Sequence, residues 1–483
     1  MTRGELVRRG AVVGGGLFLG GPARLIDSAL AAFDPHAAHH WVSRPDLRPP
    51  VLEVLKHTKD ASAGSVFLAP LSGPGQRGSL ILDGGGEPVW FRPATPVVSL
   101  NFRAAIWQGK PVLTWWEGKT QHGLGEGDHV VADHTYKELA RLPHAGNHRP
   151  SDLHEFLITS KGTALVTSWE HIFMDLTPYG GRKDGVVVGG IVSEIELPTG
   201  RVLFEWRSID HIGLDESHVG PNPAGAWDYF HVNSIDLDTD GNFLVSARNT
   251  WGVYKIERAT GNVLWRLGGK KTDFAMGPGT VFAFQHDARH HGDGDTLISL
   301  FDDGSAPTVQ PFSKGLVLAL DHKRKTATLH RSYVHHPTLS SHALGSVQLL
   351  PNGNWLVGWG TTRYLTEYTH DGAVVFDARL PKGGQNYRVL KMPWRGYPTT
   401  PPVAAIRSES DRRYAYASWN GATEVAAWQV EAGHGSALSG AGSFRRAGFE
   451  TRMLLPRGTR YARVTAVDAH GKALGTSKTA HVG

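Results

Sequence analysis

The feature that most constrains the fold is a repeated alternation of short apolar strands and tight polar turns. Its clearest copy runs from His231 to Gly269. The turn sequences in this copy are Thr239-Asp240-Gly241-Asn242 and Ala259-Thr260-Gly261-Asn262. Asp-Gly and Gly-Asn pairs provide the positive φ angles that tight hairpins require. The pattern therefore predicts antiparallel strands at residues 233–236, 243–246, 252–256 and 263–266.

The same pattern recurs along the chain, with turn glycines at positions 162, 241, 294 and 353. The separations between them are 79, 53 and 59 residues. Each separation can hold four short strands with their loops, and two weaker copies fit residues 63–96 and 100–142. Because such a repeat cannot bury a face alone, we expect an all-β, six-bladed β-propeller over residues 63–398. The alternative is a pair of β-sandwiches, which the similarity of the repeats disfavours.

The N-terminal residues have the pattern of an export signal. Arg8 and Arg9 precede an apolar, glycine-rich stretch from Ala11 to Gly21, and Ala29-Leu30-Ala31 provides a small-residue cleavage site. This order predicts a twin-arginine-type signal over residues 1–32 and an exported, periplasmic or extracellular protein. No other apolar run is long enough to predict an integral membrane domain.

Two further segments flank the repeats. Residues 33–62 carry several prolines and are expected to form an extended lead-in. After residue 402 the composition shifts, and Tyr461 to Val467 alternates in the manner of a strand before the turn Asp468-Ala469-His470-Gly471. Residues 403–483 are therefore expected to form a fibronectin type III-like β-sandwich.

Composition excludes several classes of function. The chain has no cysteine, which rules out disulfides, thiolate metal ligands and a cysteine nucleophile. The net charge is +5, but no run of Lys and Arg with interleaved aromatic residues marks a nucleic-acid surface. We therefore expect small-molecule partners rather than nucleic acid, and the sequence leaves the oligomeric state open.

Four of the 26 histidines occupy comparable places in successive repeats. His154, His231, His286 and His342 lie 8, 10, 8 and 11 residues before the turn glycine of their repeat. Equivalent positions of successive blades converge on the axis of a propeller. We therefore expect these imidazoles to face one cavity.

Several motifs of the chain, taken together, resemble the arylsulfotransferase family over residues 60–400. They are His231-Val232-Asn233-Ser234-Ile235-Asp236 with Arg248 17 residues after His231, Asn262 to Gly269, Phe284-Gln285-His286-Asp287-Ala288-Arg289, Asp152 to Phe156, and Leu344 to Gln348. Members of this family are exported propeller enzymes that move sulfuryl groups between phenols without a nucleotide donor. The chain indeed lacks the phosphate-binding loop G-x-x-x-x-G-K-[ST].

The resemblance implies a role for individual residues. It implies that His286 is transiently sulfurylated in a ping-pong transfer that needs no cofactor and no metal. It implies further that His231 and Asn233 lie beside the transferred group, that Arg248 binds its oxygens, and that His154 is another active-site histidine. The substrates would be an aryl sulfate donor and a phenolic acceptor.

These residue types suit that chemistry. A neutral imidazole is a good nucleophile near pH 7, and a covalent intermediate divides one difficult transfer into two easier steps. A guanidinium offers two parallel hydrogen bonds to sulfuryl oxygens, and a second histidine can exchange a proton with the phenol oxygen. We also expect Arg289, Trp251 and His342 to contact the substrate.

Three other functions remain open from the sequence. A metalloenzyme would use His290 and His291, or His286 with Asp287 or Asp302, although no known ligand spacing is present. A quinone-dependent dehydrogenase is also a tryptophan-rich propeller, but the chain lacks a regular tryptophan motif in every repeat. A family member without activity would bind a ligand and not turn it over.

Overall fold

The computed structural model describes residues 36–292 and 296–482. These residues are organised almost entirely as β-strands, so the predicted all-β class is confirmed. The helical segments within them are single 3-10 turns, η1 (Thr177–Tyr179), η2 (Ser208–Asp210) and η3 (Leu214–Glu216). The predicted export signal at residues 1–32 and the turn glycine at position 294 lie outside the described residues.

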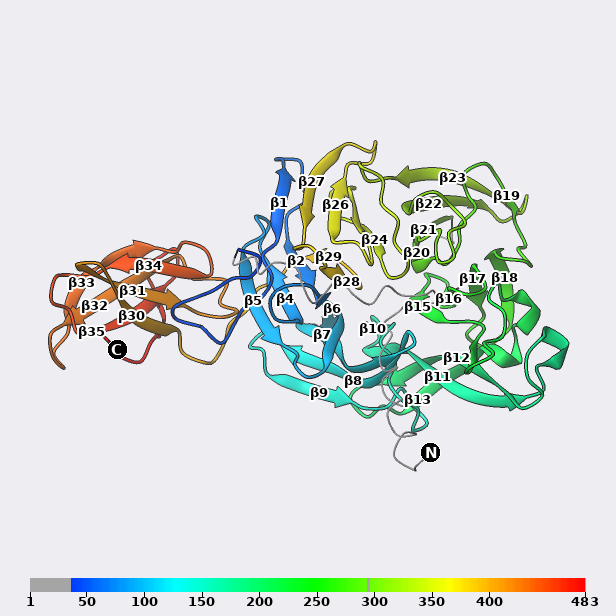
Figure 1. The fold of residues 1–483 in the computed structure, drawn as a ribbon, viewed down its shortest axis with the longest axis horizontal. Coiled ribbons are helices and arrows are strands. Elements are labelled where there is room, and N and C mark those ends of the chain that lie inside the picture. The colour runs from blue at the N-terminus through cyan, green and yellow to red at the C-terminus, as the bar shows by residue number, and fades with distance from the viewer. Residues whose placement is uncertain (1–35, 293–295, 483) are drawn as a thin grey trace, which may run out of the picture.

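Up to residue 392, the described chain forms six sheets whose main strands are antiparallel and which stand around a ring (Figure 1). From the axis outwards, the first comprises β29 (Leu390–Met392), β2 (Ser65–Leu68), β4 (Gly78–Leu82) and β5 (Pro88–Pro93). The second comprises β6 (Val98–Trp107), β7 (Lys110–Gln121), β8 (Leu124–Asp133) and β9 (Glu138–Leu142). The third comprises β10 (Phe156–Ile158), β11 (Thr163–Met174), β12 (Gly185–Glu196) and β13 (Val202–Arg207), with β14 (Trp227–Asp228) parallel to β12.

The remaining three sheets complete the ring. The fourth comprises β15 (Val232–Leu237), β16 (Phe243–Ala247), β17 (Gly252–Ile256) and β18 (Val263–Gly268). The fifth comprises β20 (His286–His291), β21 (Leu297–Asp302), β22 (Lys314–Asp321), β23 (Thr326–Tyr333) and β19 (Ala275–Met276). The sixth comprises β24 (Ser346–Leu349), β25 (Trp355–Gly358), β26 (Tyr364–Tyr368), β27 (Val374–Arg379) and β1 (Glu53–His57).

The fourth sheet is the segment whose turns were clearest in the sequence. Its strands cover all four predicted ranges, and the two predicted turns join β15 to β16, with Leu237 opposite Phe243, and β17 to β18. Gly241 and Gly261 adopt φ angles of 81° and 78° at the predicted turns. These angles lie in the left-handed region that glycine enters without steric cost, so the turn residues account for this register.

The ring is closed by strands from both ends of its sequence. β29 pairs with β2, with Val66 opposite Lys391, and so provides the axial strand of the first sheet. β1 pairs with β27, with Glu53 opposite Arg379, and so extends the sixth sheet outwards. A short pair, β3 (Pro70–Ser72) with β28 (Gln385–Asn386), lies beside this junction. The pattern of repeats predicts neither β1 nor β29, because both lie outside the repeats.

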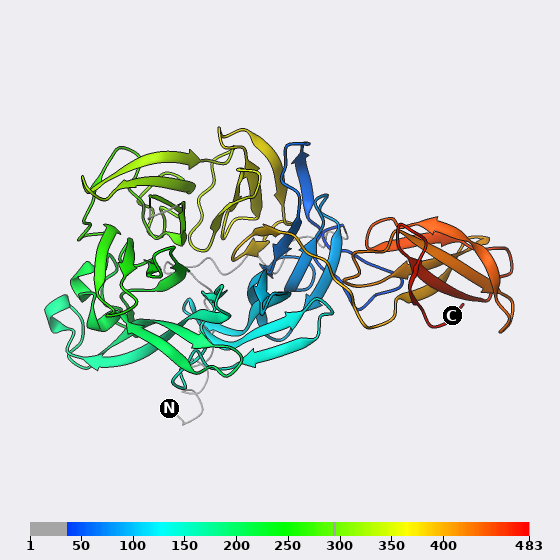
Figure 2. The same ribbon diagram turned by 180° about the vertical axis from the view of Figure 1, so that it is seen from behind.

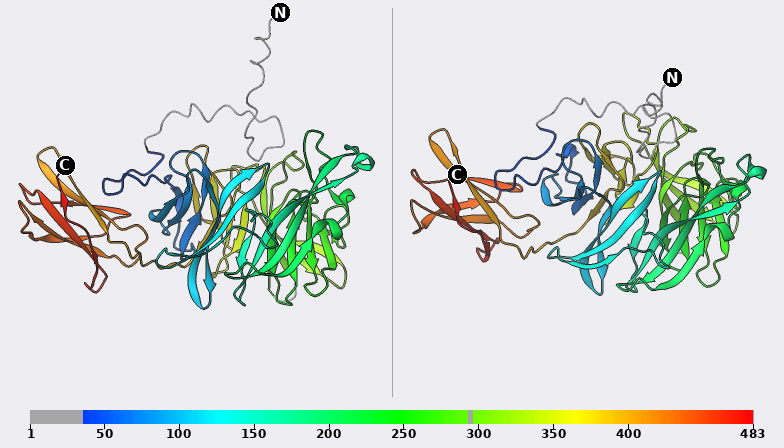
Figure 3. Two further views of the ribbon diagram at one scale, coloured as in Figure 1. Left: turned by 90° about the horizontal axis from the view of Figure 1, so that it is seen from below. Right: turned by 60° about the horizontal axis from the view of Figure 1, so that its bottom comes forward.

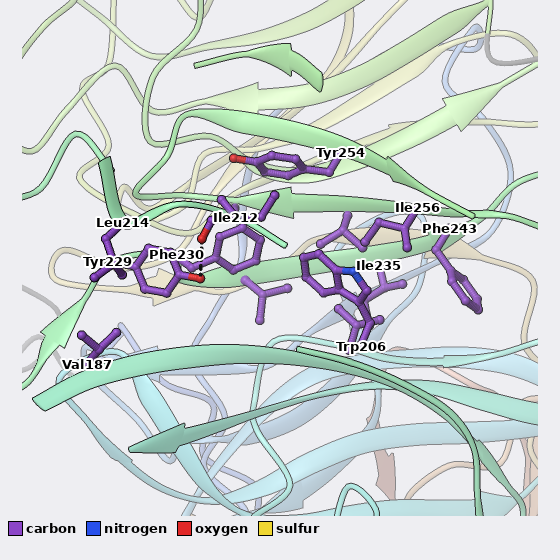
Figure 4. Close-up of a cluster of buried hydrophobic side chains, with 14 of the residues drawn as sticks. Val187, Trp206, Ile212, Leu214, Tyr229, Phe230, Ile235, Phe243, Tyr254 and Ile256 are labelled. Atoms are coloured by element: carbon purple, nitrogen blue, oxygen red, sulfur yellow. Dashed lines mark hydrogen bonds between the residues drawn. The ribbon is translucent and has the colours of Figure 1, made fainter. Parts of the chain in front are cut away.

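Apolar clusters fill the spaces between neighbouring sheets. The largest lies between the third and fourth sheets, where Trp206, Tyr229, Phe230 and Tyr254 are buried (Figure 4). Comparable clusters lie between the other neighbouring sheets. Each sheet therefore buries both faces, which explains why so many axial and middle strands consist of consecutive apolar residues.

The C-terminal residues form a separate pair of sheets beside the ring (Figures 2 and 3). One comprises β30 (Val403–Glu409), β31 (Arg412–Ser418) and β34 (Glu450–Leu454). The other comprises β33 (Ser439–Arg445), β32 (Ala427–Gly433), β35 (Tyr461–Val467), β36 (Ala473–Thr476) and β37 (Ala480–His481). The two sheets share one apolar cluster around Trp428, and the fibronectin type III-like assignment stays a prediction.

The lead-in joins the C-terminal sheets to the ring. The backbone N–H of Ser43 donates to Glu450 at 2.6 Å, and the ring of Trp41 stacks on Phe449 with centroids 3.9 Å apart. Asn420 also donates to and accepts from the backbone of Phe91. These contacts attach the C-terminal module to the ring at places outside the connecting segment.

Candidate active site

Three of the four expected histidines meet at one end of the ring axis. His154 precedes β10, His231 precedes β15 and His286 is the first residue of β20, so each stands at the start of an axial strand (Figure 1). The rings of His154 and His231 lie nearly perpendicular, with centroids 4.9 Å apart. Charges on both of these imidazoles would lower the pKa of His286, which places the third ring in the same neighbourhood. All three side chains are buried.

Each of the three imidazoles is held by a carboxylate through Nδ1. The distances from Nδ1 to the carboxylate oxygen are 2.5 Å for His154 and Asp152, 2.5 Å for His231 and Asp228, and 2.7 Å for His286 and Asp303. Within the described residues, the Nε2 atoms of His154 and His231 are buried and have no hydrogen-bond partner. A carboxylate at Nδ1 fixes the ring, so Nε2 is the reactive edge of each imidazole.

The tautomer of His286 follows from its two contacts. The backbone N–H of Leu344 donates to Nε2 at 3.3 Å, so Nε2 carries the lone pair and the proton lies on Nδ1, which donates to Asp303. Leu344 has a φ of 72° and is followed by Gly345, where a Cβ would lie 2.3 Å from the ring of Phe301. Gly345 therefore permits the turn that aims this N–H at His286.

The charge of His286 is set by burial and by neighbouring cations. Burial lowers the pKa of this imidazole well below its usual value, and the Arg248 guanidinium lowers it further. The ring is therefore neutral at neutral pH, and its Nε2 lone pair can attack an electrophile once the long hydrogen bond from the N–H of Leu344 is given up.

Arg248 lies close to two of the three carboxylates. Burial lowers its pKa, whereas the charges of Asp303 and Asp228 oppose that shift. Its Nη1 donates to Asn249 at 2.9 Å and its Nη2 to the backbone oxygen of His342 at 3.1 Å. The guanidinium carbon lies 4.6 Å from the centre of the Phe284 ring. Because a guanidinium has five N–H donors, Arg248 keeps capacity for an anionic ligand.

A family model described as "Arylsulfotransferase (ASST)" matches residues 103–380, which is more than half of the chain. The chain belongs to the arylsulfotransferase family. The matched range contains all eight residues that the sequence analysis assigned to the site. No curated protein matches the sequence of this arylsulfotransferase family member.

Solved structures with some similarity were also found. One is a protein of unknown function from Bacteroides caccae, with 14% identity, a TM-score of 0.42, and coverage of 68% of this chain and 98% of that one. Another is a protein from Lactobacillus plantarum, with 12% identity, a TM-score of 0.38, and coverage of 82% and 100%. A third is the Cps50 (Swd1) β-propeller domain of Myceliophteria thermophila, with 9% identity, a TM-score of 0.32, and coverage of 68% and 97%.

Asn233 of this family member lies on β15, two residues after His231. Its Nδ2 donates to the backbone oxygen of Gln285 at 2.7 Å, next to His286 in the chain. Its Oδ1 is buried and has no partner among the described residues. The contact ties the start of β15 to the start of β20, and the second N–H of the amide has no protein acceptor among the described residues.

Trp251 and His342 lie around Arg248. Trp251 stacks on His218, with centroids 3.6 Å apart, and meets the ring of Phe284 edge-on at 5.1 Å. His342 is exposed, and its Nδ1 lies 3.1 Å from the Ser305 hydroxyl. The structure therefore does not bring His342 into the cluster with the other three imidazoles, and only its backbone reaches the site through Arg248.

Arg289 is engaged in a layer of ion pairs along the axis. Its guanidinium donates to Asp287 at 2.7 Å, to Glu155 at 2.5 Å and to the backbone oxygen of Ile235 at 2.9 Å. Burial raises the pKa of Glu155, but Arg289 and Arg388 together lower it to about 2. These contacts occupy the donors of Arg289 with protein groups, so its geometry favours a structural role over the predicted contact with substrate.

Five residues near the site were absent from the sequence prediction of site residues. Asp152, Asp228 and Asp303 hold the histidines, and Tyr387 donates to the backbone oxygens of His154 and Asn233 at 3.2 Å each. Arg388 contacts Glu155 at 2.8 Å. Asp152 and Asp228 stand two and three residues before their histidines, so an acidic residue just upstream of each histidine was a signal that could have identified them. Tyr387 and Arg388 lie in no recognised motif, and no comparable signal marks them.

In residues 36–292 and 296–482, no three His, Asp or Glu side chains gather in an arrangement that fits a metal ion. In the same ranges, no helix combines the length and the apolar character that a bilayer crossing requires.

Proposed function

We propose that this protein is an aryl sulfate sulfotransferase that works through a sulfohistidine at His286, without a nucleotide donor. One observation carries the proposal: a buried, neutral imidazole presents the lone pair of Nε2 beside the Arg248 cation, within a cluster of carboxylate-held histidines. Membership of the arylsulfotransferase family supports the same chemistry.

The first half-reaction transfers the sulfuryl group to the enzyme. Nε2 of His286 attacks the sulfur of an aryl sulfate, and the S–O bond to the aryl group breaks with its electron pair on the phenol oxygen. The Nε2–H of a protonated His231 gives that oxygen a proton, so that a phenol leaves, whereas burial lowers the pKa of His154 and disfavours its protonated form. Arg248 stabilises the charge on the sulfuryl oxygens, as cationic donors do in phosphoryl transfer.

The second half-reaction regenerates the histidine. An acceptor phenol gives its proton to the same neighbouring imidazole, its oxygen attacks sulfur, and the S–N bond breaks with its electron pair on Nε2. Asp303 holds Nδ1–H throughout and stabilises the positive charge that the imidazole carries as the sulfohistidine forms.

We also propose the fold around this site and the cellular location of the protein. The six sheets around a ring support a six-bladed β-propeller, and the two C-terminal sheets support a fibronectin type III-like module. The pattern at residues 1–32 supports export by the twin-arginine route. An exported location suits a donor that is itself an aryl sulfate, because no intracellular nucleotide is then required.

The deciding experiment is incubation of the protein with 4-nitrophenyl sulfate and a phenol acceptor. We expect release of 4-nitrophenol that rises with acceptor concentration, and sulfation of the acceptor detected by mass spectrometry. The His286→Ala variant, matched for circular dichroism, should show neither. Release of 4-nitrophenol without sulfation of any acceptor would indicate a sulfatase, and binding of the ester without turnover would indicate a ligand-binding protein; both outcomes contradict the proposal.

A further inference from the structure

A cavity lies where the axial strands β6 and β10 end, opposite to the strand starts that carry the three histidines. Its volume is about 570 Å³, within the range of small-molecule sites. Two segments of the chain and one further residue line it. The first segment is Arg103 to Gly109 without Trp107, the second is Leu157 to Gly162, and the further residue is Met392. His154 stands before β10 whereas Leu157 to Gly162 finish that strand and turn into β11, so the cavity lies beyond the three-histidine cluster along the axis.

Arg103 gives this cavity a cationic floor. Its side chain is 17% exposed, and its ion pair is with Glu155 at 3.9 Å, beyond hydrogen-bond distance. Closer arginines already occupy the Glu155 oxygens, Arg388 at 2.8 Å and Arg289 at 2.5 Å. Among the described residues, no hydrogen bond satisfies the guanidinium of Arg103. Burial lowers its pKa to about 10, so the group is still charged at neutral pH.

The walls of the cavity differ in polarity. Ile106 is 62% exposed, an unusual state for isoleucine, and Leu157 and Met392 continue the apolar wall. Thr159, Ser160 and Lys161 form the opposite rim. A ligand with one anionic group and an apolar body would meet a cation, an apolar wall and a polar rim at the same time.

We propose that this cavity, with Arg103 at its floor and Ile106 on its wall, is a second binding site that takes an amphipathic organic anion. The ion pairs between Glu155 and Arg388 separate it from the sulfuryl site, so the two sites hold separate molecules. The proposal goes beyond the sulfotransferase function and does not depend on it. It can be tested by measuring ligand binding alone, without any assay of activity.

The probe is 1-anilinonaphthalene-8-sulfonate, an aryl sulfonate whose fluorescence rises in apolar surroundings. The full-length Arg248→Ala variant is titrated, because the proposed sulfuryl site then lacks its main cation. We expect one saturable site, and at least 10-fold weaker binding after the further change Arg103→Met, since a charge-assisted pair is lost. N-phenyl-1-naphthylamine, which lacks the sulfonate, should bind at least 10-fold more weakly than the sulfonate.

Two further variants keep the test decisive. Ile106→Ser changes an exposed position and should weaken binding of the sulfonate several-fold, even if Arg103→Met does not fold. Arg324→Met removes an arginine that is 82% exposed on another sheet and should change binding less than twofold. Equal affinity of the Arg103→Met and parent proteins, or equal affinity for the two probes, overturns the proposal. Loss of all binding with Arg248→Ala alone also overturns it.

Discussion

At the scale of single residues, each of the three site histidines is paired with a carboxylate through Nδ1, and this pairing decides that Nε2 is the nitrogen that faces the substrate. Asp303 is the best test, because it is buried and holds Nδ1 of the proposed nucleophile at 2.7 Å. Burial raises the pKa of Asp303 well above its usual value, whereas Arg248 opposes that rise. The carboxylate, the guanidinium and the imidazole are therefore one electrostatic unit.

We predict that Asp303→Asn lowers kcat for sulfuryl transfer by about 10²-fold or more, since the amide no longer stabilises the charged imidazole or selects its tautomer. Steady-state kinetics with 4-nitrophenyl sulfate would measure the loss. Asp302→Asn is the matched control: Asp302 is the buried neighbour, accepts from the backbone of Ala283, and should change kcat less than about threefold. Equal losses in the two variants would contradict a specific role of Asp303.

Arg248 should affect both the rate and its dependence on pH. Arg248→Ala should lower kcat/KM by about 10²-fold or more if the guanidinium stabilises the sulfuryl oxygens. The cation also lowers the pKa of His286, whose neutral form is the active one. The residual activity of the variant should therefore begin to fall at a higher pH on acidification than wild-type activity does.

The pH profile of kcat/KM measures this shift directly. The wild-type profile should show no loss attributable to His286 near pH 6.5, because burial and Arg248 move its titration well below that value. An Arg248→Lys variant retains a cation and should keep the wild-type position of the acid limb while losing rate. An acid limb at the same pH in all three proteins would exclude electrostatic control of His286 by Arg248.

At the scale of elements, the prediction succeeded where local turn chemistry decides the structure. The Asp-Gly and Gly-Asn turns of residues 231–269 fix how β15 pairs with β16 and how β17 pairs with β18, and these strands were predicted closely. The convergence of His154, His231 and His286 was predicted from their equivalent places in successive repeats. The same reasoning gave a wrong prediction for His342, because its side chain is exposed in the turn before β24.

Elements that depend on distant partners were not predictable. Strand β29 is only three residues long and pairs with a strand more than 300 positions earlier, so no local pattern marks it. Asp228 lies only three residues before His231 and Asp303 only 17 after His286, so these two carboxylates were missed because they lie outside the recognised motifs, not because they are distant in sequence. The part of the fold that could not be predicted is thus the axial strand that forms by long-range pairing.

The importance of β29 is testable. Leu390 is 7% exposed and packs in the apolar cluster between the first and second sheets. We predict that Leu390→Asp lowers the free energy of unfolding by about 3 kcal/mol or more, because a carboxylate replaces a packed side chain. Chemical denaturation measures the loss. Leu139→Asp, on β9 and 44% exposed, is the matched control and should change stability by less than about 1 kcal/mol.

At the scale of the whole molecule, stability should fall on mild acidification. Several imidazoles are buried as neutral rings, and burial lowers the pKa of His129 to about 3. A pKa lowered in the folded state means that the unfolded chain binds more protons below pH 6.5. Each such group therefore contributes stability that is complete above about pH 6.5 and decreases as the pH falls towards its folded pKa, with a slope of about 1.4 kcal/mol per pH unit.

His129 allows this effect to be tested at a buried histidine that has no proposed role in sulfuryl transfer. Its ring stacks on Phe156, with centroids 4.6 Å apart, and neither ring nitrogen has a hydrogen-bond partner in the described part of the chain. We predict that His129→Phe reduces the slope of the unfolding free energy against pH between about pH 4 and 6. The reduction should be about 1.4 kcal/mol per pH unit, which corresponds to one proton. Urea unfolding at several pH values measures it. An unchanged slope would show that His129 does not titrate on unfolding.

Ring closure also has a consequence for biosynthesis. The ribosome makes β2 early, but its partner β29 exists only after residue 392 has been added. Until then the growing polypeptide exposes an unpaired backbone edge at Ser65–Leu68, a ready template for aggregation. A cell that makes this protein must therefore shield that edge through most of translation, and premature termination before Leu390 would release a chain that can never become a finished ring.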